Sequence, residues 1–271
     1  MKSAVTICLV PEAARGPFVF HGDLAAGCRS AAELGFDAVE VFAAGRDDVA
    51  DATLRRTLAA HGLALAAAGT GAGWVKHGLS LCHADAGNRG RAREFIGGIV
   101  DAAGDLGAPA ISGSRQGRRG GDDTRDAAHD LRADALHDLG RRAARHGRPL
   151  LYEPLNRYET DLFNRQAEAA AFLRERGIAN VTLLSDLFHM NLEEADMAAA
   201  LVACGDLVGH VHWADSNRQA VGCGHTDVAP CVAALRAIGY RGFLSAEVLP
   251  LPTPLEAARR SLAGFRAFTT G

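Results

Sequence analysis

The sequence has no uninterrupted apolar stretch close to the roughly 18–20 residues that a membrane-spanning helix requires. It also lacks an excess of basic residues: 29 Lys and Arg stand against 32 Asp and Glu, which argues against binding to a nucleic-acid backbone. Hydrophobic residues make up 48% of the chain, too large a share for intrinsic disorder. Composition therefore predicts a soluble globular protein with no membrane or nucleic-acid partner.

Paired cysteines are absent as well, because the 6 cysteines are scattered and none forms a C-x-x-C motif. Several lie inside apolar patterns, where a free cysteine behaves as a small buried hydrophobe. We therefore expect a reduced, cytoplasmic protein. The apolar segment from Ala4 to Val10 is interrupted by Pro11 and Glu12 and has no convincing cleavage site, so it predicts a first β-strand rather than a signal peptide.

Short β-branched or Leu-rich runs alternate with Ala/Arg/Leu-rich stretches of helical period along the whole chain. Glycines such as Gly35 and Gly62 follow the helical stretches, where a left-handed residue ends a helix. The clearest helical patterns cover Ala50–His61, Arg91–Leu106 and Leu131–His146. The eight predicted strands are Val5–Val10, Ala38–Phe42, Ala64–Ala68, Ala108–Ser112, Leu150–Glu153, Val181–Asp186, Gly209–Ala214 and Phe243–Val248.

Eight such units in 271 residues favour a single α/β domain over residues 1–271, a closed (β/α)₈ TIM barrel. An open doubly wound sheet has the same local pattern, but no G-x-G-x-x-G follows the first strand. The irregular segment Gly113–Asp123 follows the fourth predicted strand. It is interpreted either as a solvated loop or as a loop that faces the substrate.

The last four predicted strands each carry a potential metal ligand at or near the carboxyl end. In a (β/α)₈ barrel these ends converge at one face, where the chemistry takes place. Three carboxylates and one imidazole form a hard site that suits Mn²⁺ or Mg²⁺ and tolerates Co²⁺ or Zn²⁺. The four residues are Glu153, Asp186, His212 and Glu247.

Four segments that contain these residues resemble the xylose-isomerase-like barrel superfamily, and within it the ketose 3-epimerases of the D-tagatose 3-epimerase type. In chain order they read YEPLNRYET from Tyr152, SDLFHMNLEE from Ser185, GHVHWADSNR from Gly209 and SAEVLP from Ser245. The resemblance covers the second half of the chain. Before residue 145 only the alternation of strands and helices agrees with it.

The resemblance implies that the four residues hold one divalent ion, with Mn²⁺ preferred, and that Glu153 and Glu247 also form an acid/base pair. It further implies that Glu159, His189 and Arg218 bind substrate oxygens. Without the resemblance, these last three also fit solvated or packed side chains.

Further residues near the predicted site have weaker signals. His210 shares the strand face of His212 and is interpreted as a residue of the barrel interior. Glu40, near the end of the second strand, is a weaker fifth candidate for the site. Three large aromatic residues fit either the wall of a pocket or plain core packing: Phe18, Trp74 and Trp213.

The implied activity is C3 epimerisation of a free ketose through a cis-enediolate, in a homo-oligomer such as a dimer or tetramer. Aldose–ketose isomerisation and water loss from an inosose are related possibilities, because they share the enediolate. An apurinic-site endonuclease would need histidines at the ends of the third and fourth strands, where this chain has Gly69, Thr70, Ser112 and Gly113. A sugar-binding barrel without catalysis also agrees with the sequence.

Overall fold

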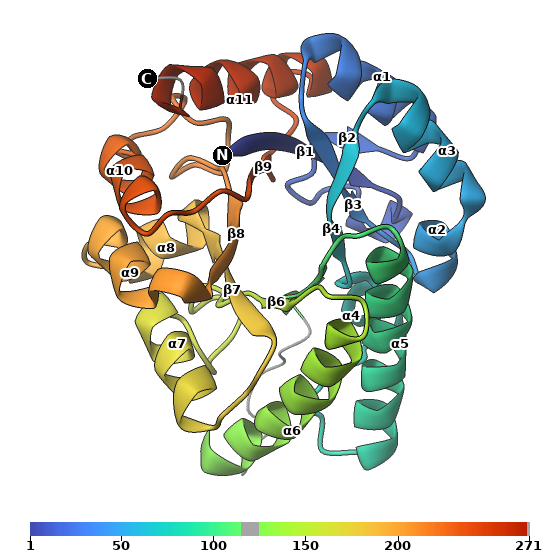
Figure 1. Ribbon diagram of the computed structural model, residues 1–271, viewed down its shortest axis with the longest axis vertical. Helices are drawn as coiled ribbons and strands as arrows, with labels where there is room; N and C mark the ends of the chain where they lie inside the picture. The colour runs from blue at the N-terminus through green and yellow to red at the C-terminus, as the bar shows by residue number, and fades with distance from the viewer. Residues whose placement is uncertain (115–124, 270–271) are drawn as a thin grey trace.

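The computed structural model describes residues 1–114 and 125–269, and its strands close into a barrel (Figure 1). The sheet order is β2-β1-β3-β4-β5-β6-β7-β8-β9, all pairings are parallel, and β1 also pairs with β9. The short β2 pairs with β1 alone among the described residues, so eight strands form the closed ring. The predicted (β/α)₈ barrel is confirmed.

Most strands lie where the sequence pattern predicts them, with small shifts at their ends. The largest shift is at β1, which covers Lys2–Cys8 instead of Val5–Val10. The apolar sequence continues through Leu9 and Val10, which lie beyond the end of the strand. Both side chains pack against hydrophobic neighbours, so they are apolar although they are not in the strand. The remaining strands are β2 Phe20–His21, β3 Ala38–Phe42, β4 Ala64–Gly69, β5 Ala110–Ser112, β6 Leu150–Tyr152, β7 Val181–Asp186, β8 Val208–His212 and β9 Phe243–Ala246.

Helices surround the barrel, and the last one, α11, packs against α1 (Figure 1). The helices are α1 Leu24–Leu34, α2 Arg46–Ala50, α3 Ala52–His61, α4 Ala72–His77, α5 Ala86–Asp105, α6 Arg125–Ala144, α7 Gln166–Glu175, α8 Leu187–Glu193, α9 Met197–Cys204, α10 Ala229–Ala237 and α11 Pro254–Thr269, with short 3₁₀ turns η1 Pro11–Ala13 and η3 Gly205–Leu207. Among the described residues, we find no helix that combines the length and the apolarity of a membrane span.

Local signals explain where individual helices begin and end. The predicted helix Ala50–His61 is divided at Asp51, because the Asp51 carboxylate accepts the backbone N–H of Thr53 and thereby starts α3. Gly62 then ends α3 with φ of 65°, a left-handed conformation that glycine adopts without strain. The sequence pattern identified the helical region but not the cap inside it.

Two faces of the strands build two separate cores. Ala68, Ala110, Leu150 and Leu183 belong to the large cluster that joins strands and helices. Their neighbours along the strands point the other way, into the barrel, where Ala67, Ile111, Leu151 and Leu184 form a small cluster of their own. Side chains that fill the barrel make it a rigid support for groups at the carboxyl ends of its strands.

Candidate metal centre and substrate cavity

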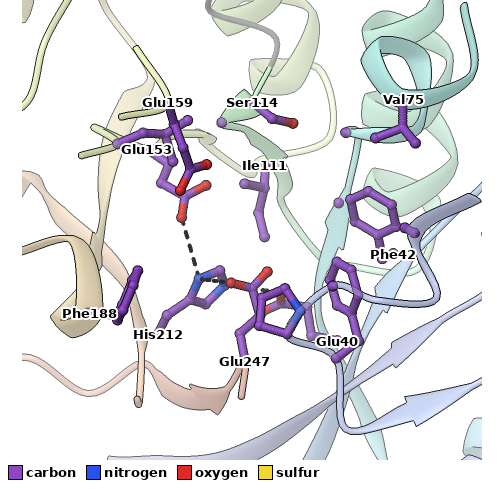
Figure 2. A pocket seen from close by; sticks show the side chains of 18 of the residues that line it. Glu40, Phe42, Val75, Ile111, Ser114, Glu153, Glu159, Phe188, His212 and Glu247 are labelled. Atoms are coloured by element: carbon purple, nitrogen blue, oxygen red, sulfur yellow. Dashed lines mark hydrogen bonds and ion pairs between the residues drawn. The ribbon is translucent and has the colours of Figure 1, made fainter. Parts of the chain in front are cut away.

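The four predicted metal ligands lie together at the carboxyl ends of neighbouring strands. Glu153 follows β6, Asp186 ends β7, His212 ends β8 and Glu247 follows β9. Each residue offers one ligand atom, and these atoms all lie within 4.8 Å of one another. Figure 2 shows the side chains of Glu153, His212 and Glu247 pointing toward one another. The structure thus brings together all four residues that the sequence nominated for a metal site.

His212 directs its Nδ1 atom toward the three carboxylates. Nδ1 lies 3.2 Å from Oδ2 of Asp186, 3.3 Å from Oε2 of Glu247 and 3.5 Å from Oε1 of Glu153. His212 itself is almost fully buried. Nδ1 is therefore the nitrogen of His212 that is placed to serve as a ligand.

The other nitrogen of His212 contacts Glu40, the weaker fifth candidate from the sequence. Nε2 of His212 lies 3.1 Å from Oε1 of Glu40, and Nε2 of His210 lies 2.8 Å from Oε2 of the same carboxylate. All three side chains are buried. An ionised carboxylate only accepts hydrogen bonds, so both histidines donate from Nε2. Glu40 and His210 thus form a layer beneath the cluster, as the sequence suggested for His210.

The two carboxylate oxygens of Asp186 have different partners: one contacts the backbone and the other faces the cluster. Oδ1 accepts the N–H of Phe188 at 2.8 Å and starts α8. Oδ2 faces His212 and also accepts a hydrogen bond of 2.6 Å from Nη1 of Arg218. The helix cap fixes the orientation of the carboxylate, because rotation would break the bond to Phe188.

Arg218 bridges two of the candidate ligands. Its guanidinium donates to Asp186 and, through Nη2, to Glu247. The guanidinium also lies 4.8 Å from the centroid of the Phe188 ring. Arg218 is 8% exposed and has φ of 60°, a left-handed conformation that is unusual for a residue with a side chain. The sequence nominated Arg218 as a substrate-binding residue, and the structure places it at the edge of the cluster.

The loop that carries Arg218 is organised around Asp215, which no sequence pattern indicated. Asp215 is buried, and its carboxylate accepts several backbone N–H groups of the same loop. Burial would raise the pKa of Asp215, but these hydrogen bonds outweigh it and lower the pKa to about 2. The donors are the backbone N–H groups of Ser216, Gly222, Gly224 and Thr226.

Burial and neighbouring charges have opposing effects on the pKa values of the groups in the cluster. Burial raises the pKa of Glu153 above its ordinary range, although His212 opposes this effect. Burial also acts to raise the pKa of Asp186, but the charge of Arg218 outweighs it and the pKa is lowered. For His212, burial lowers the pKa, whereas the carboxylates of Glu247 and Glu40 raise it well above the ordinary value.

This donor set fits a divalent cation. Three carboxylates and one imidazole nitrogen within 4.8 Å are hard ligands of the kind that Mn²⁺, Mg²⁺, Co²⁺ or Zn²⁺ takes in proteins. Glu153, Asp186 and His212 are buried, and carboxylates gathered away from water require compensating positive charge. The neighbouring Arg218 supplies part of this charge through its ion pair with Asp186.

His189 and Glu159, the other predicted substrate-binding residues, lie beside the cluster. Nε2 of His189 is 3.7 Å from Oδ2 of Asp186 and 3.9 Å from Oε1 of Glu153. Nδ1 of His189 is 3.8 Å from Oε1 of Glu159. The buried side chain of Asn156 contacts both residues, at 2.7 Å to Nδ1 of His189 and 3.0 Å to Oε1 of Glu159. Asn156 carries no sequence signal beyond its place in the segment YEPLNRYET.

A cavity of about 440 Å³ opens above the cluster. Glu153, His189 and Arg218 line one side, and Figure 2 shows Phe42 and Val75 across the opening from Glu153 and Phe188. The cavity therefore has a polar end at the ligand cluster and an apolar wall opposite. Its remaining lining includes Phe18, Ile111, Gly113, Ser114 and Leu249.

Of the three aromatic residues that the sequence suggested for the cavity wall, only Phe18 contributes. Its ring centroid lies 4.6 Å from that of Phe42, and both residues line the cavity. Trp213 is buried and contacts Phe268, and Trp74 is 48% exposed; neither is among the lining residues. Only the first two residues of the segment Gly113–Asp123 lie within the described part of the chain, so a role for that segment in facing the substrate stays a prediction.

The fold agrees with comparisons to known proteins. The model of the xylose isomerase-like TIM barrel family matches residues 28–268. An L-ribulose 3-epimerase of Mesorhizobium japonicum is 33% identical over 222 residues, which cover 79% of this chain and 72% of that protein. A 3-dehydro-D-guloside 4-epimerase of Escherichia coli is 37% identical over 142 residues, which are 52% of this chain and only 54% of that protein.

Solved structures extend the similarity over nearly the whole chain. A D-allulose 3-epimerase from Methylomonas sp. superposes with a TM-score of 0.81 at 26% sequence identity. The superposition covers 98% of this chain and 98% of that one. The similarity therefore extends to the first half of the chain, where the sequence carried no diagnostic motif.

Proposed function

This chain belongs to the xylose isomerase-like TIM barrel family, and we propose that it is a divalent-metal-dependent epimerase that inverts C3 of a ketose. The observation that carries the proposal is the cluster of Glu153, Asp186, His212 and Glu247 at the end of a cavity large enough for a sugar. Relatives named as 3-epimerases of ketoses support the reaction type.

Glu153, Asp186, His212 and Glu247 are proposed to hold one divalent ion, with Mn²⁺ preferred and Mg²⁺, Co²⁺ or Zn²⁺ fitting the same donors. When bound, such an ion supplies Lewis acidity, which polarises a ketone and makes the neighbouring C–H more acidic.

Glu153 and Glu247 are proposed to move the proton. Inversion of a carbon beside a carbonyl requires a base that removes the proton on one face and an acid that returns one on the other. The two carboxylates come from different strands, β6 and β9, and both line the cavity. Burial raises the pKa of Glu153, which favours a carboxyl group that can hold a proton.

His189, Arg218 and Glu159 are proposed to bind oxygens of the ketose. Arg218 and His189 present N–H groups next to the carboxylate cluster, where negative charge develops on the substrate during proton removal. Glu159 is more exposed than the other two residues and lies at the rim, where a carboxylate can accept a hydrogen bond from a sugar hydroxyl.

Proton exchange provides the direct test. The protein, loaded with Mn²⁺, is incubated in D₂O with a panel of free ketoses, and deuterium at C3 is followed by NMR together with the appearance of the C3 epimer. We expect exchange and epimer formation with at least one ketose. Absence of exchange with every ketose contradicts the proposal.

A 3-dehydroglycoside is a second candidate substrate. The Escherichia coli relative is named for epimerisation at C4 of such a compound, where the inverted carbon again lies beside a ketone. The cavity of about 440 Å³ has an apolar wall that offers room for a substituent on the sugar. Exchange at C4 of a 3-dehydroglycoside, without exchange at C3 of any ketose, would favour this substrate class.

Isomerisation, dehydration, DNA cleavage and simple sugar binding each have a distinct readout. Aldose formation begins with proton removal at C1 instead of C3, so it is followed in the same incubations as deuterium at C1 and as aldose product. Loss of water is followed in a separate incubation with an inosose. For an endonuclease, the described ends of β4 and β5 carry Gly69, Thr70, Ser112 and Gly113 in place of histidines. Metal-dependent nicking of an abasic duplex would support that activity. Sugar binding without any exchange would support a binding protein.

A further inference from the structure

Asn156 lies in the loop after β6 and makes hydrogen bonds through every polar atom of its side chain. Oδ1 accepts the backbone N–H of Tyr158 at 3.0 Å. Nδ2 faces Oε1 of Glu159 at 3.0 Å and Nδ1 of His189 at 2.7 Å. Asn156 is 3% exposed, so it has little access to water as a substitute partner.

These neighbours determine the orientation of the Asn156 amide. The backbone N–H of Tyr158 can only donate, so the atom that faces it must be the amide oxygen. The ionised carboxylate of Glu159 can only accept, so the atom that faces it must be the amide nitrogen. An exchange of the two amide ends would place donor against donor and acceptor against acceptor.

The same arrangement determines which nitrogen of His189 carries the proton. Because Nδ2 of Asn156 donates, Nδ1 of His189 must accept. The backbone N–H of Asn156 also points at Nδ1 of His189, at 3.4 Å, and a backbone N–H cannot reverse its role. Neutral His189 therefore has its proton on Nε2, the nitrogen on the side of Asp186 and Glu153.

We propose that Asn156 is a positioning residue that fixes His189 as the Nε2–H tautomer, so that His189 donates a hydrogen bond to a ketose oxygen at the polar end of the cavity. This inference rests on the proposed function for its substrate. The donor matters there because the oxygen gains negative charge when the neighbouring C–H loses its proton. The opposite tautomer would direct a lone pair at that oxygen and repel it.

The tautomer is tested first in the unaltered protein. The ¹⁵N NMR spectrum of protein labelled at histidine distinguishes a protonated ring nitrogen from an unprotonated one, and comparison with His189→Ala identifies the His189 signals. We expect a protonated Nε2 and an unprotonated Nδ1. A protonated Nδ1 overturns the proposal, and this readout needs neither substrate nor turnover.

Asn156→Asp tests the consequence for catalysis. The substitution preserves shape but places a carboxylate oxygen against Nδ1 of His189, which favours a proton on that nitrogen. We expect the His189 signals to show a protonated Nδ1 and kcat/KM to fall by up to about 10²-fold, because the hydrogen-bond donor that faces the developing charge is lost. Wild-type kcat/KM in Asn156→Asp contradicts the proposal.

Two further variants distinguish an effect of Asn156 through His189 from a general structural effect on the loop after β6. In a His189→Ala background, Asn156→Asp should cause little additional loss, because the residue through which Asn156 acts is gone. Asn164→Ala removes hydrogen bonds to the carbonyls of Leu155 and Thr160 in the same loop without touching His189, and should leave the His189 tautomer unchanged. A full additional loss in the double variant overturns the proposal. If wild type turns over no ketose, the proposed function fails while the tautomer measurement still stands.

Discussion

Glu40 and His212 are hydrogen-bonded in the barrel interior, with Oε1 and Nε2 3.1 Å apart, although 172 positions separate them in the sequence. The carboxylate holds the Nε2–H end of the ring and leaves Nδ1 as the nitrogen that faces Asp186, Glu247 and Glu153. Glu40 thereby prepares His212 to act as a ligand, in the way that carboxylates orient metal-binding histidines in general.

Glu40→Gln should weaken metal binding. An amide has one acceptor oxygen in place of the two that His212 and His210 use, and it lacks the negative charge that makes the imidazole a stronger ligand. We expect the dissociation constant for Mn²⁺, measured by titration calorimetry, to rise about 10–100-fold. The exposed Glu168→Gln on α7 serves as control and should bind Mn²⁺ as wild type does. Unchanged affinity in Glu40→Gln would show that this contact does not orient His212.

Glu153→Gln and Glu247→Gln should each abolish most turnover while the fold remains. Each substitution removes a group that can accept or return the substrate proton, an effect typically of about 10²–10⁴-fold on rate. Steady-state kinetics at saturating Mn²⁺ provide the measurement, and far-UV circular dichroism checks the fold. Near-native turnover in either variant is incompatible with the acid/base pair.

Removal of the metal should lower thermal stability. Without a cation, carboxylates within 4.8 Å of one another repel, and a ligand present at about 100 times its dissociation constant stabilises by about 2.7 kcal/mol. For a chain of this size that corresponds to a Tm increase of roughly 5–10 °C when Mn²⁺ is added to chelator-treated protein. Asp186→Asn should lose most of this increase. An equal Tm with and without Mn²⁺ would argue against a metal site in the cluster.

Gly113→Ala should impair catalysis although the substitution adds one methyl group. A Cβ at position 113 would overlap Oε2 of Glu153, so the carboxylate must move away from its neighbours in the cluster. We expect a loss of at least about tenfold in kcat/KM, since small misplacements of catalytic groups are costly. Gly90→Ala is the matched control, because nothing lies within 4 Å of a Cβ there. Equal activity of both variants would mean that Glu153 tolerates the displacement.

Asp215→Asn should destabilise the protein in a pH-dependent manner. Because the folded-state pKa of Asp215 is lowered to about 2 from an ordinary 3.8, its ionised carboxylate stabilises the fold above about pH 4, and this contribution is lost as pH falls toward 2. The shift corresponds to about 2 kcal/mol. Urea unfolding should therefore show a large difference between wild type and Asp215→Asn at pH 7 and a small one near pH 2.

The exposed Asp134→Asn on α6 is the control for this measurement and should follow wild type at every pH. A constant difference between wild type and Asp215→Asn from pH 7 to pH 2 would contradict the assignment of the lowered pKa to the loop around Asp215. Because this loop carries Arg218, we also expect Asp215→Asn to raise KM for the ketose.

The sequence was most informative where a local pattern has only one structural outcome. Gly62 after α3, for example, ends the helix because its left-handed backbone suits glycine, and such signals marked the repeated units of the barrel. The four candidate ligands could be nominated for a related reason: the carboxyl ends of parallel barrel strands meet at one face, so residues at those ends are neighbours.

The sequence was least informative where a side chain acts through backbone groups or through a distant strand. The carboxylate of Asp215 and the amide oxygen of Asn156 accept hydrogen bonds from backbone N–H groups. Every residue except proline has a backbone N–H, so no sequence motif identifies such a contact. The left-handed backbone conformation of Arg218 could not be predicted from the sequence either, because it depends on the path of the whole loop.

By itself, then, the amino-acid order determined the eight alternating units and the residues at their strand ends, since hydrophobic period and helix-ending glycines act between near neighbours. Only the closed barrel decided that Glu40 on β3 meets Nε2 of His212 on β8, which leaves Nδ1 to face Asp186. The reason is that strand curvature and side-chain orientation inside a barrel depend on all its strands together.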